Sequence, residues 1–214
     1  MDESANDLVL KTFVKLYNDK LIYQADKLVN WDIKLKTAIS DIEVINKETP
    51  SKMYYFKYEI VDSKEYLIVA TTRPETMFGD IGLFVNPNDK RYKKYIGKYA
   101  INPVNGEKLK IYSDEYIDIT FGTGVMKCTP AHDFNDYELA KKHNIVEYYS
   151  VFNFDGTLND KCGKFVGMDR LIARPKIVEW IKEKDLLIKI ENHKSNIGYS
   201  ERTNEVIEPL ISKQ

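Results

Sequence analysis

The sequence contains few cysteines, the residues that cross-link small domains through disulfides or bind zinc. Its 214 residues include only two cysteines, Cys128 and Cys162. They form no C-x-x-C pair, which argues against both a zinc knuckle and a disulfide framework. We therefore expect a protein of a reducing compartment, and the cytoplasm fits. No metal-ligand set or cofactor motif is visible, so neither a metal nor a cofactor is expected.

The sequence also lacks a strong net charge and a long apolar run. Its formal net charge is −1, whereas a protein that grips nucleic acid alone is usually basic. Any RNA contact is therefore expected to be local, or to depend on parts of a larger protein. No segment approaches membrane-spanning length, and the N-terminus is too acidic for a signal peptide, so no membrane association is expected.

The composition is that of a folded domain, with 43% hydrophobic and 30% charged residues. The length allows one sizeable core, or one domain with an appendage. There is no internal repeat and no low-complexity segment. Many short apolar runs with a few helical patterns between them predict an α+β fold with a closed or nearly closed sheet.

Helical patterns cover residues 2–19, 88–96, 134–143 and 169–184. Asp133 and Asp169 stand where N-caps are expected for the last two. Pro175 should kink the last helix, or mark the first turn of a shorter one.

Strand patterns begin after a polar break at residues 46–51. Two hairpins are expected, one joining residues 53–61 to 65–71 and one joining 100–104 to 108–112 through Asn105-Gly106. Further short strands are predicted at residues 81–85, 125–129, 146–152 and 186–191.

Polar side chains gather in the stretch Gly-Thr-Gly-Val-Met-Lys-Cys-Thr-Pro-Ala-His-Asp-Phe-Asn-Asp, residues 122–136. A strand that Pro130 ends, followed by a capped helix start, would bring five of them to one concave spot. These five are Lys127, Thr129, His132, Asp133 and Asp136. Taken alone, the stretch could equally be a helix cap with solvated surface charges.

A second stretch, Ala-Thr-Thr-Arg-Pro-Glu-Thr-Met-Phe-Gly-Asp at residues 70–80, follows the apolar end of an expected strand. Together the two stretches resemble the editing domain inserted into the valyl-, isoleucyl- and leucyl-tRNA synthetases of class I. Its signatures, "TTRPET" and "GTG…K.TPAHD..DY", occur here in the expected order. The resemblance covers nearly the whole chain and implies a β-barrel-like core decorated by helices.

The resemblance extends to the segments that join such a domain to its synthetase. Residues 28–44 and 198–214 resemble the chain that enters the insertion and the chain that returns from it. This divides the sequence into an incoming linker segment at 1–48, an editing domain at 49–197 and a return segment at 198–214. The nucleotide signatures "HIGH" and "KMSKS" are missing, so this stretch should not form aminoacyl-adenylate.

The reaction implied by the resemblance is post-transfer editing, the hydrolysis of the ester that joins a wrong amino acid to tRNA. Lys127 and Ala131 resemble the valyl type, which implies threonine as the rejected amino acid. Apolar pockets reject an added hydroxyl poorly, and threonine at valyl-tRNA synthetase is the familiar example of that limit. The implied partners are the 3′-terminal adenosine of tRNA(Val) carrying threonine, and the remainder of the synthetase.

Three other interpretations remain open at this point. The chain could be an isoleucyl- or leucyl-type editing domain, or a module that binds the tRNA end without hydrolysing it. A free-standing hydrolase of a small ester is the third, and the two flanking segments argue against it.

The resemblance names Asp136 as the residue that binds the substrate's α-ammonium, and a carboxylate near a helix start suits that role. Lys127 is the second candidate of the catalytic set. Asp133 is the third, and could hold the substrate's polar side chain or a water, or serve only as the N-cap. Cys128 should point to the strand face opposite Lys127, which argues against a covalent mechanism. A positioned water is the more economical one.

Seven further residues are predicted to bind substrate: Thr71, Thr72, Arg73, Thr76, Phe121, Thr129 and His132. Arg73 could stabilise a carbonyl oxygen or a phosphate, or pair with Glu75 or Asp80. Phe121 could stack on the terminal adenine or belong to the core. His132 could be a base or a supporting residue.

Overall fold

The computed structural model describes residues 2–214, which divide into two compact units. One unit contains the residues up to Lys27 together with Ile211–Gln214, and the other is Leu28–Leu210. In the first unit, helix α1 (Glu3–Asn18) begins at Asp2, whose carboxylate accepts from the backbone N–H of Ser4. The helix predicted at residues 2–19 is confirmed. Within the described residues, no helix is both long and apolar enough to cross a membrane.

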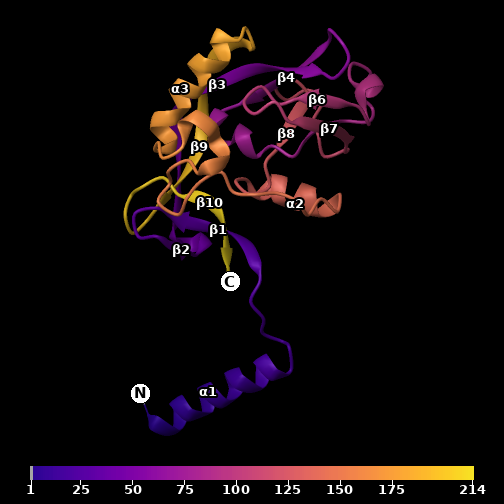
Figure 1. Ribbon diagram of the computed structural model, residues 1–214. Helices are drawn as coiled ribbons and strands as arrows, with labels where there is room; N and C mark the ends of the chain where they lie inside the picture. Colours follow the sequence, from indigo (N-terminus) through magenta and orange to yellow (C-terminus); the bar gives the residue numbers. More distant parts are fainter. Residues whose placement is uncertain (1) are drawn as a thin grey trace. The chain divides into compact units, whose positions relative to one another are not determined.

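The larger unit is built on a seven-stranded sheet (Figure 1). Its strands are β3 (Val44–Ile60), β4 (Tyr66–Thr71), β5 (Gly82–Val85), β6 (Tyr99–Ile101), β7 (Lys108–Ser113), β8 (Val125–Cys128) and β9 (Leu187–Ser200). They follow the order β4-β3-β6-β7-β5-β8, with β9 paired to β3, and only β5 and β7 are parallel. The end strands β4 and β8 also contact each other, so the sheet curls into a half-barrel.

Helices and a smaller sheet complete the fold. Strands β1 (Asp26–Asp32), β2 (Thr37–Ile39) and β10 (Glu208–Lys213) form a three-stranded sheet in the order β10-β1-β2. The longer helices are α2 (Phe134–Lys142) and α3 (Arg170–Glu183), and the 3-10 turns are η1 (Asp41–Glu43), η2 (Pro74–Gly79), η3 (Lys93–Tyr95) and η4 (Asp160–Phe165). The predicted α+β class with a barrel-like core is confirmed.

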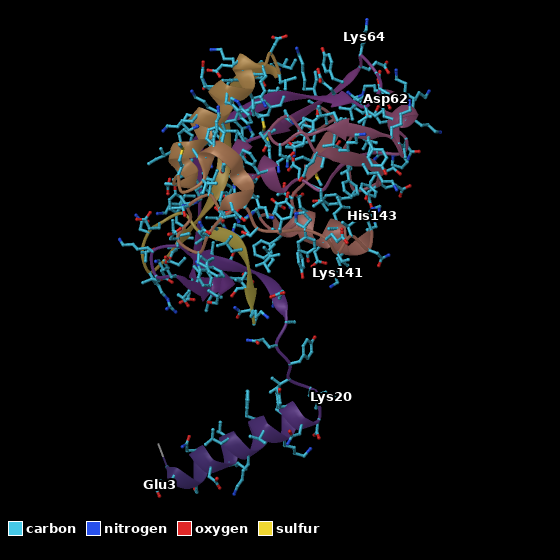
Figure 2. All side chains as sticks on the ribbon, viewed as in Figure 1. Glu3, Lys20, Asp62, Lys64, Lys141 and His143 are labelled. Atoms are coloured by element: carbon cyan, nitrogen blue, oxygen red, sulfur yellow. The ribbon has the colours of Figure 1, made fainter. Side chains whose placement is uncertain are left out.

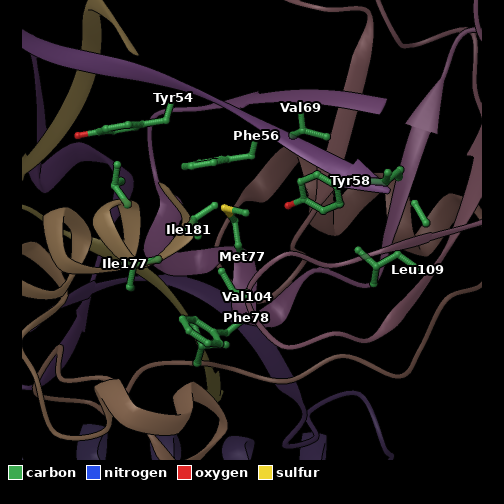
Figure 3. Close-up of a cluster of buried hydrophobic side chains, with 14 of the residues drawn as sticks. Tyr54, Phe56, Tyr58, Val69, Met77, Phe78, Val104, Leu109, Ile177 and Ile181 are labelled. Atoms are coloured by element: carbon green, nitrogen blue, oxygen red, sulfur yellow. The ribbon is translucent and has the colours of Figure 1, made fainter. Parts of the chain in front are cut away.

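The core forms because β3 alternates in its second half. Tyr54, Phe56, Tyr58 and Ile60 all turn to one face and are buried, as period-two alternation requires. Figure 3 shows this row beside buried side chains of β4, η2 and α3. The core therefore fixes η2 against the sheet, next to the end of β4.

Several predicted elements are confirmed. The first hairpin turns at residues 62–64, where Asp62 has φ 58° (Figure 2). The second joins β6 to β7 in antiparallel register. Helix α3 begins directly after Asp169, whose carboxylate caps it, and it continues through Pro175. The shorter alternative for that helix is wrong.

The polar break predicted at residues 46–51 is wrong. Strand β3 runs through it, paired with β9 from Val44 and Ser200 to Phe56 and Leu187. The predicted strand at 186–191 is likewise only the first part of β9. Most side chains of this ribbon are exposed or half-buried, so its sequence is polar although its backbone is paired.

Two other predictions fail for local reasons. The helix predicted at residues 88–96 is reduced to the short turn η3. The carboxylate of Asp89 accepts hydrogen bonds from the backbone N–H and the guanidinium of Arg91, and these local bonds replace a helix start. Residues 146–152 form no strand, and only Phe152 makes an isolated bridge, to Leu158. Their apolar character reflects burial of Val151 and Phe152 rather than strand pairing.

Candidate functional site

A cavity of about 490 Å³ lies between the end of β4 with η2 on one side and β8 with the start of α2 on the other. All ten predicted site residues line it: Thr71, Thr72, Arg73, Thr76, Phe121, Lys127, Thr129, His132, Asp133 and Asp136. Two sequence stretches that lie about fifty residues apart in the chain therefore meet in one site.

The local sequence around β8 explains how the second wall forms. Alternation along β8 sends Lys127 to the cavity and Cys128 to a separate apolar cluster, where burial raises the pKa of its thiol. After Pro130, the Asp133 carboxylate accepts from the backbone N–H groups of Asn135 (2.8 Å) and Asp136 (3.1 Å). Asp133 is thus the N-cap of α2, and its cap geometry points Asp136 inward.

Asp136 is the most perturbed acid of the cavity. Its carboxylate accepts from the backbone N–H of Thr129 at 2.7 Å, and the residue is only 7% exposed. Burial raises its pKa to about 7, against the opposing effects of the Lys127 ammonium and the Thr129 N–H. A cation brought to this carboxylate would favour its ionised form, so the group is suited to bind an ammonium.

The ammonium group of Lys127 is surrounded by side-chain oxygen atoms. Its Nζ lies 3.1 Å from Asp80 Oδ1 and 3.2 Å from Thr76 Oγ1, and it also contacts Thr129 Oγ1. Although burial opposes it, the carboxylates of Asp80 and Asp136 raise the pKa of Lys127, so the ammonium is charged. The cavity therefore presents a fixed cation beside two hydroxyls.

Asp80 is a contributor that sequence reasoning misjudged. It is buried beneath the cavity wall and accepts from Tyr58 Oη (2.7 Å), Thr129 Oγ1 (2.6 Å) and Lys127. The sequence suggested it only as a partner of Arg73. Asp80 is the last residue of the first signature stretch, and Lys127 lies in the second. These two positions were the feature of the sequence that could have indicated the pair.

Arg73 joins the two walls of the cavity. Its Nη1 donates to the carbonyl of His132 at 3.2 Å, and its other nitrogens pair with Glu75 and Glu208. The predicted alternative of pairing with Glu75 is thus confirmed, while Asp80 pairs elsewhere. With its nitrogens already engaged, the guanidinium serves to hold the cavity together.

His132 is held as a neutral ring. Its Nε2 accepts from the backbone N–H of Val151 (2.9 Å), while Nδ1 lies 3.2 Å from the carbonyl of Pro209 and donates to it. Burial and the nearby Arg73 lower the pKa of His132 well below its ordinary value. The geometry thus favours the supporting role over the role of base.

The rim of the cavity carries exposed aromatic rings. Phe121 is 70% exposed, so it does not belong to the core, and Tyr116 is 57% exposed on the same rim. Sequence reasoning did not single out Tyr116, which has no motif of its own. Two accessible rings beside a polar cavity suit the stacking of a base. Among residues 2–214, no group of acidic, histidine or cysteine side chains is arranged to hold a metal ion.

The buried Asp136 leads to a prediction about stability. Because its folded pKa of about 7 exceeds the ordinary aspartate value of 3.8, its contribution to stability is complete below about pH 4 and is lost as the pH rises through about 7. Asp136→Asn keeps an acceptor for Thr129 and should raise the free energy of unfolding at pH 8 by ~2–4 kcal/mol. Urea denaturation at pH 4 and pH 8 measures this, and a gain that does not depend on pH would contradict it.

Comparison with known proteins relates this chain to a family. A sequence model of the leucyl-tRNA synthetase editing domain matches residues 86–165. Over all 214 residues, the chain is 55% identical to a valine–tRNA ligase of Ureaplasma parvum and 56% identical to one of Mycoplasma mycoides. It is 50% identical over the same length to a valine–tRNA ligase of Staphylococcus aureus. The chain spans about a quarter of the length of these relatives.

The half-barrel sheet and these matches agree. The chain belongs to the editing domains of the aminoacyl-tRNA synthetases, a family of aminoacyl-tRNA deacylases. Within that family, all 214 residues of the chain align with part of the valine–tRNA ligases named above.

Proposed function

We propose that the chain is the post-transfer editing domain of a valine–tRNA ligase, and that it hydrolyses threonine esterified to the 3′-terminal adenosine of tRNA(Val). The observation that carries this proposal is that Asp136 and Lys127 line the same cavity. Asp136 would bind the α-ammonium that every aminoacyl ester carries. Lys127, Thr76 and Thr129 would bind the β-hydroxyl of threonine, which valine lacks.

The chemistry proposed is attack of a positioned water on the ester carbonyl. The bond between the carbonyl carbon and the ribose oxygen breaks, the ribose oxygen gains a proton, and free threonine leaves. His132 and Asp133 already use their side chains for structural hydrogen bonds, which leaves the water to be activated by a vicinal ribose hydroxyl. The cavity supplies orientation and fixed charges, which can provide most of such a rate enhancement.

The rest of the chain has a place in this proposal. Residues 1–48 would lead in from the synthetase, 49–197 would form the editing domain and 198–214 would return. The remainder of the ligase and tRNA(Val) would be the partners, in the cytoplasm.

A non-catalytic module that binds the tRNA end is the rival function, because the exposed rings of Phe121 and Tyr116 would serve binding alone. The two are separated by incubating excess chain with threonine-charged tRNA(Val) and following free threonine. Release at a rate that increases with chain concentration supports hydrolysis. Binding without release supports the rival.

Phe121→Ala tests the rim. If the ring stacks on the terminal adenine, the change should raise the concentration at which charged tRNA half-saturates the chain by about 5- to 150-fold, equivalent to ~1–3 kcal/mol of binding free energy. Stability should change by less than about 0.5 kcal/mol, because the ring is exposed. Tyr99→Ala, at an exposed aromatic that does not line the cavity, is the matched control. Equal half-saturation for both variants would exclude stacking by Phe121.

A further inference from the structure

An ion cluster with buried carboxylates lies beside the cavity, and Arg73 belongs to both. It contains three guanidinium groups, from Arg73, Arg170 and Arg174, and two carboxylates, from Glu75 and Glu208. Glu75 and Glu208 are 0% and 1% exposed. Buried charges are tolerated only when they are paired, so each member depends on its neighbours.

Glu208 is the member that comes from outside the two signature stretches. It lies 135 positions from Arg73 in the sequence, at the first residue of β10, within the return segment. One of its oxygens accepts from Arg73 Nη2, and the other lies 3.0 Å from Arg170 Nε. It thus links the cavity wall to α3.

The contacts continue from Glu208 into both walls of the cavity. Arg73, which Glu208 holds, donates to the carbonyl of His132 and belongs to the same turn as Thr71 and Thr76. The next residue, Pro209, accepts from the ring of His132. The return strand therefore holds the first wall through Arg73 and the second through His132.

The cluster has little capacity to replace Glu208. Its three guanidinium groups are balanced by its two carboxylates and by the partly exposed Asp169, whose Oδ2 lies 3.9 Å from Arg170 Nη1, an atom that is buried without a hydrogen-bond partner. Loss of the Glu208 charge would leave Arg73 paired only with Glu75, at 3.4 Å. It would leave Arg170 paired only with the partly exposed Asp169, at 3.9 Å. Arg73 would then be expected to move, and this movement would change the distance between the two walls of the cavity.

We propose that Glu208 is a positioning residue of the editing site, so that the return strand completes the cavity and couples its geometry to the chain that leads back to the synthetase. This inference rests on the proposed function, because its effect is read as deacylation. It also means that the working site extends beyond residue 197.

The test compares Glu208→Gln with Glu205→Gln in the 214-residue chain. Glu205 is an exposed glutamate of the same segment and is the matched control. Single-turnover deacylation of threonine-charged tRNA(Val) is measured against chain concentration, with circular dichroism to fix the folded fraction. Glu208→Gln should lower the limiting rate per folded molecule by about 10- to 100-fold, because small misplacements of reacting groups cost that much. Glu205→Gln should match the wild type.

A second measurement needs no variant and so decides the matter if Glu208→Gln fails to fold. A non-hydrolysable analogue, threonine joined by an amide to 3′-amino-adenosine, is added to the wild-type chain, and amide hydrogen exchange is followed. Exchange at residues 206–210 should slow together with exchange at residues 71–76. Protection confined to 71–76 would overturn the proposal.

The outcomes separate the two levels of the argument. A wild-type chain that releases no threonine overturns the proposed function itself. A wild type that releases threonine, with a folded Glu208→Gln that is equally fast, overturns only the positioning role.

Discussion

Asp136→Ala is expected to abolish deacylation of threonine and valine esters alike. The carboxylate is proposed to bind the α-ammonium, which both esters carry, so its loss should not change the preference between them. Truncating one partner of a buried charge pair costs ~2–5 kcal/mol, which corresponds to a rate lower by about 30-fold to several thousand-fold. Single-turnover assays with each ester measure the effect.

Asp136→Asn is the matched variant for this prediction. It keeps the acceptor for the Thr129 N–H and the shape of the side chain, so it separates the effect of the charge from that of this hydrogen bond. It should be nearly as inactive as Asp136→Ala while remaining folded. A folded Asp136→Ala with near wild-type rates would mean that another group, with Asp133 as the next candidate, binds the ammonium.

Lys127→Met should have the second-largest effect, on stability and on substrate choice. Asp80 would lose its cation while buried, and breaking such a pair costs ~3–5 kcal/mol. The preference for the threonine ester should fall by about 10- to 100-fold, because the β-hydroxyl loses a charged hydrogen-bond partner worth ~1.5–3 kcal/mol. Urea denaturation and deacylation of both esters measure the two effects.

The double variant Lys127→Met with Asp80→Asn is the internal control. It removes both charges, so most of the lost stability should return while the substrate preference stays low. Lys141→Met, at an exposed lysine of α2, should change neither quantity. If the double variant were as unstable as Lys127→Met alone, the unpaired Asp80 carboxylate would not be the cause.

The sequence was a good guide to the cavity because its residues come in two short runs with recognisable local geometry. Proline ends a strand, aspartate caps a helix, and alternation along β8 then decides that Lys127 and Asp136 face the cavity. Strands that alternate, such as the buried half of β3, were predictable for the same reason.

Features that depend on distant partners were not predictable. The polar ribbon of β3 and β9 has no hydrophobic alternation because little of it is buried, so only pairing reveals it as a strand. Residues 146–152 look like a strand, but they form none, and the stretch buries only Val151 and Phe152. Glu208 could not be assigned to the site, since nothing near it in the sequence indicates which arginines it meets.

The central claim is that one cavity hydrolyses the threonine ester and spares the valine ester. Its most direct test is single-turnover deacylation of tRNA(Val) charged with threonine or with valine, using wild-type chain in excess. We expect the threonine ester to be hydrolysed at least about tenfold faster, since only threonine can hydrogen-bond to Lys127 and its neighbouring hydroxyls. Equal rates for the two esters, at concentrations that give clear turnover, would contradict the account.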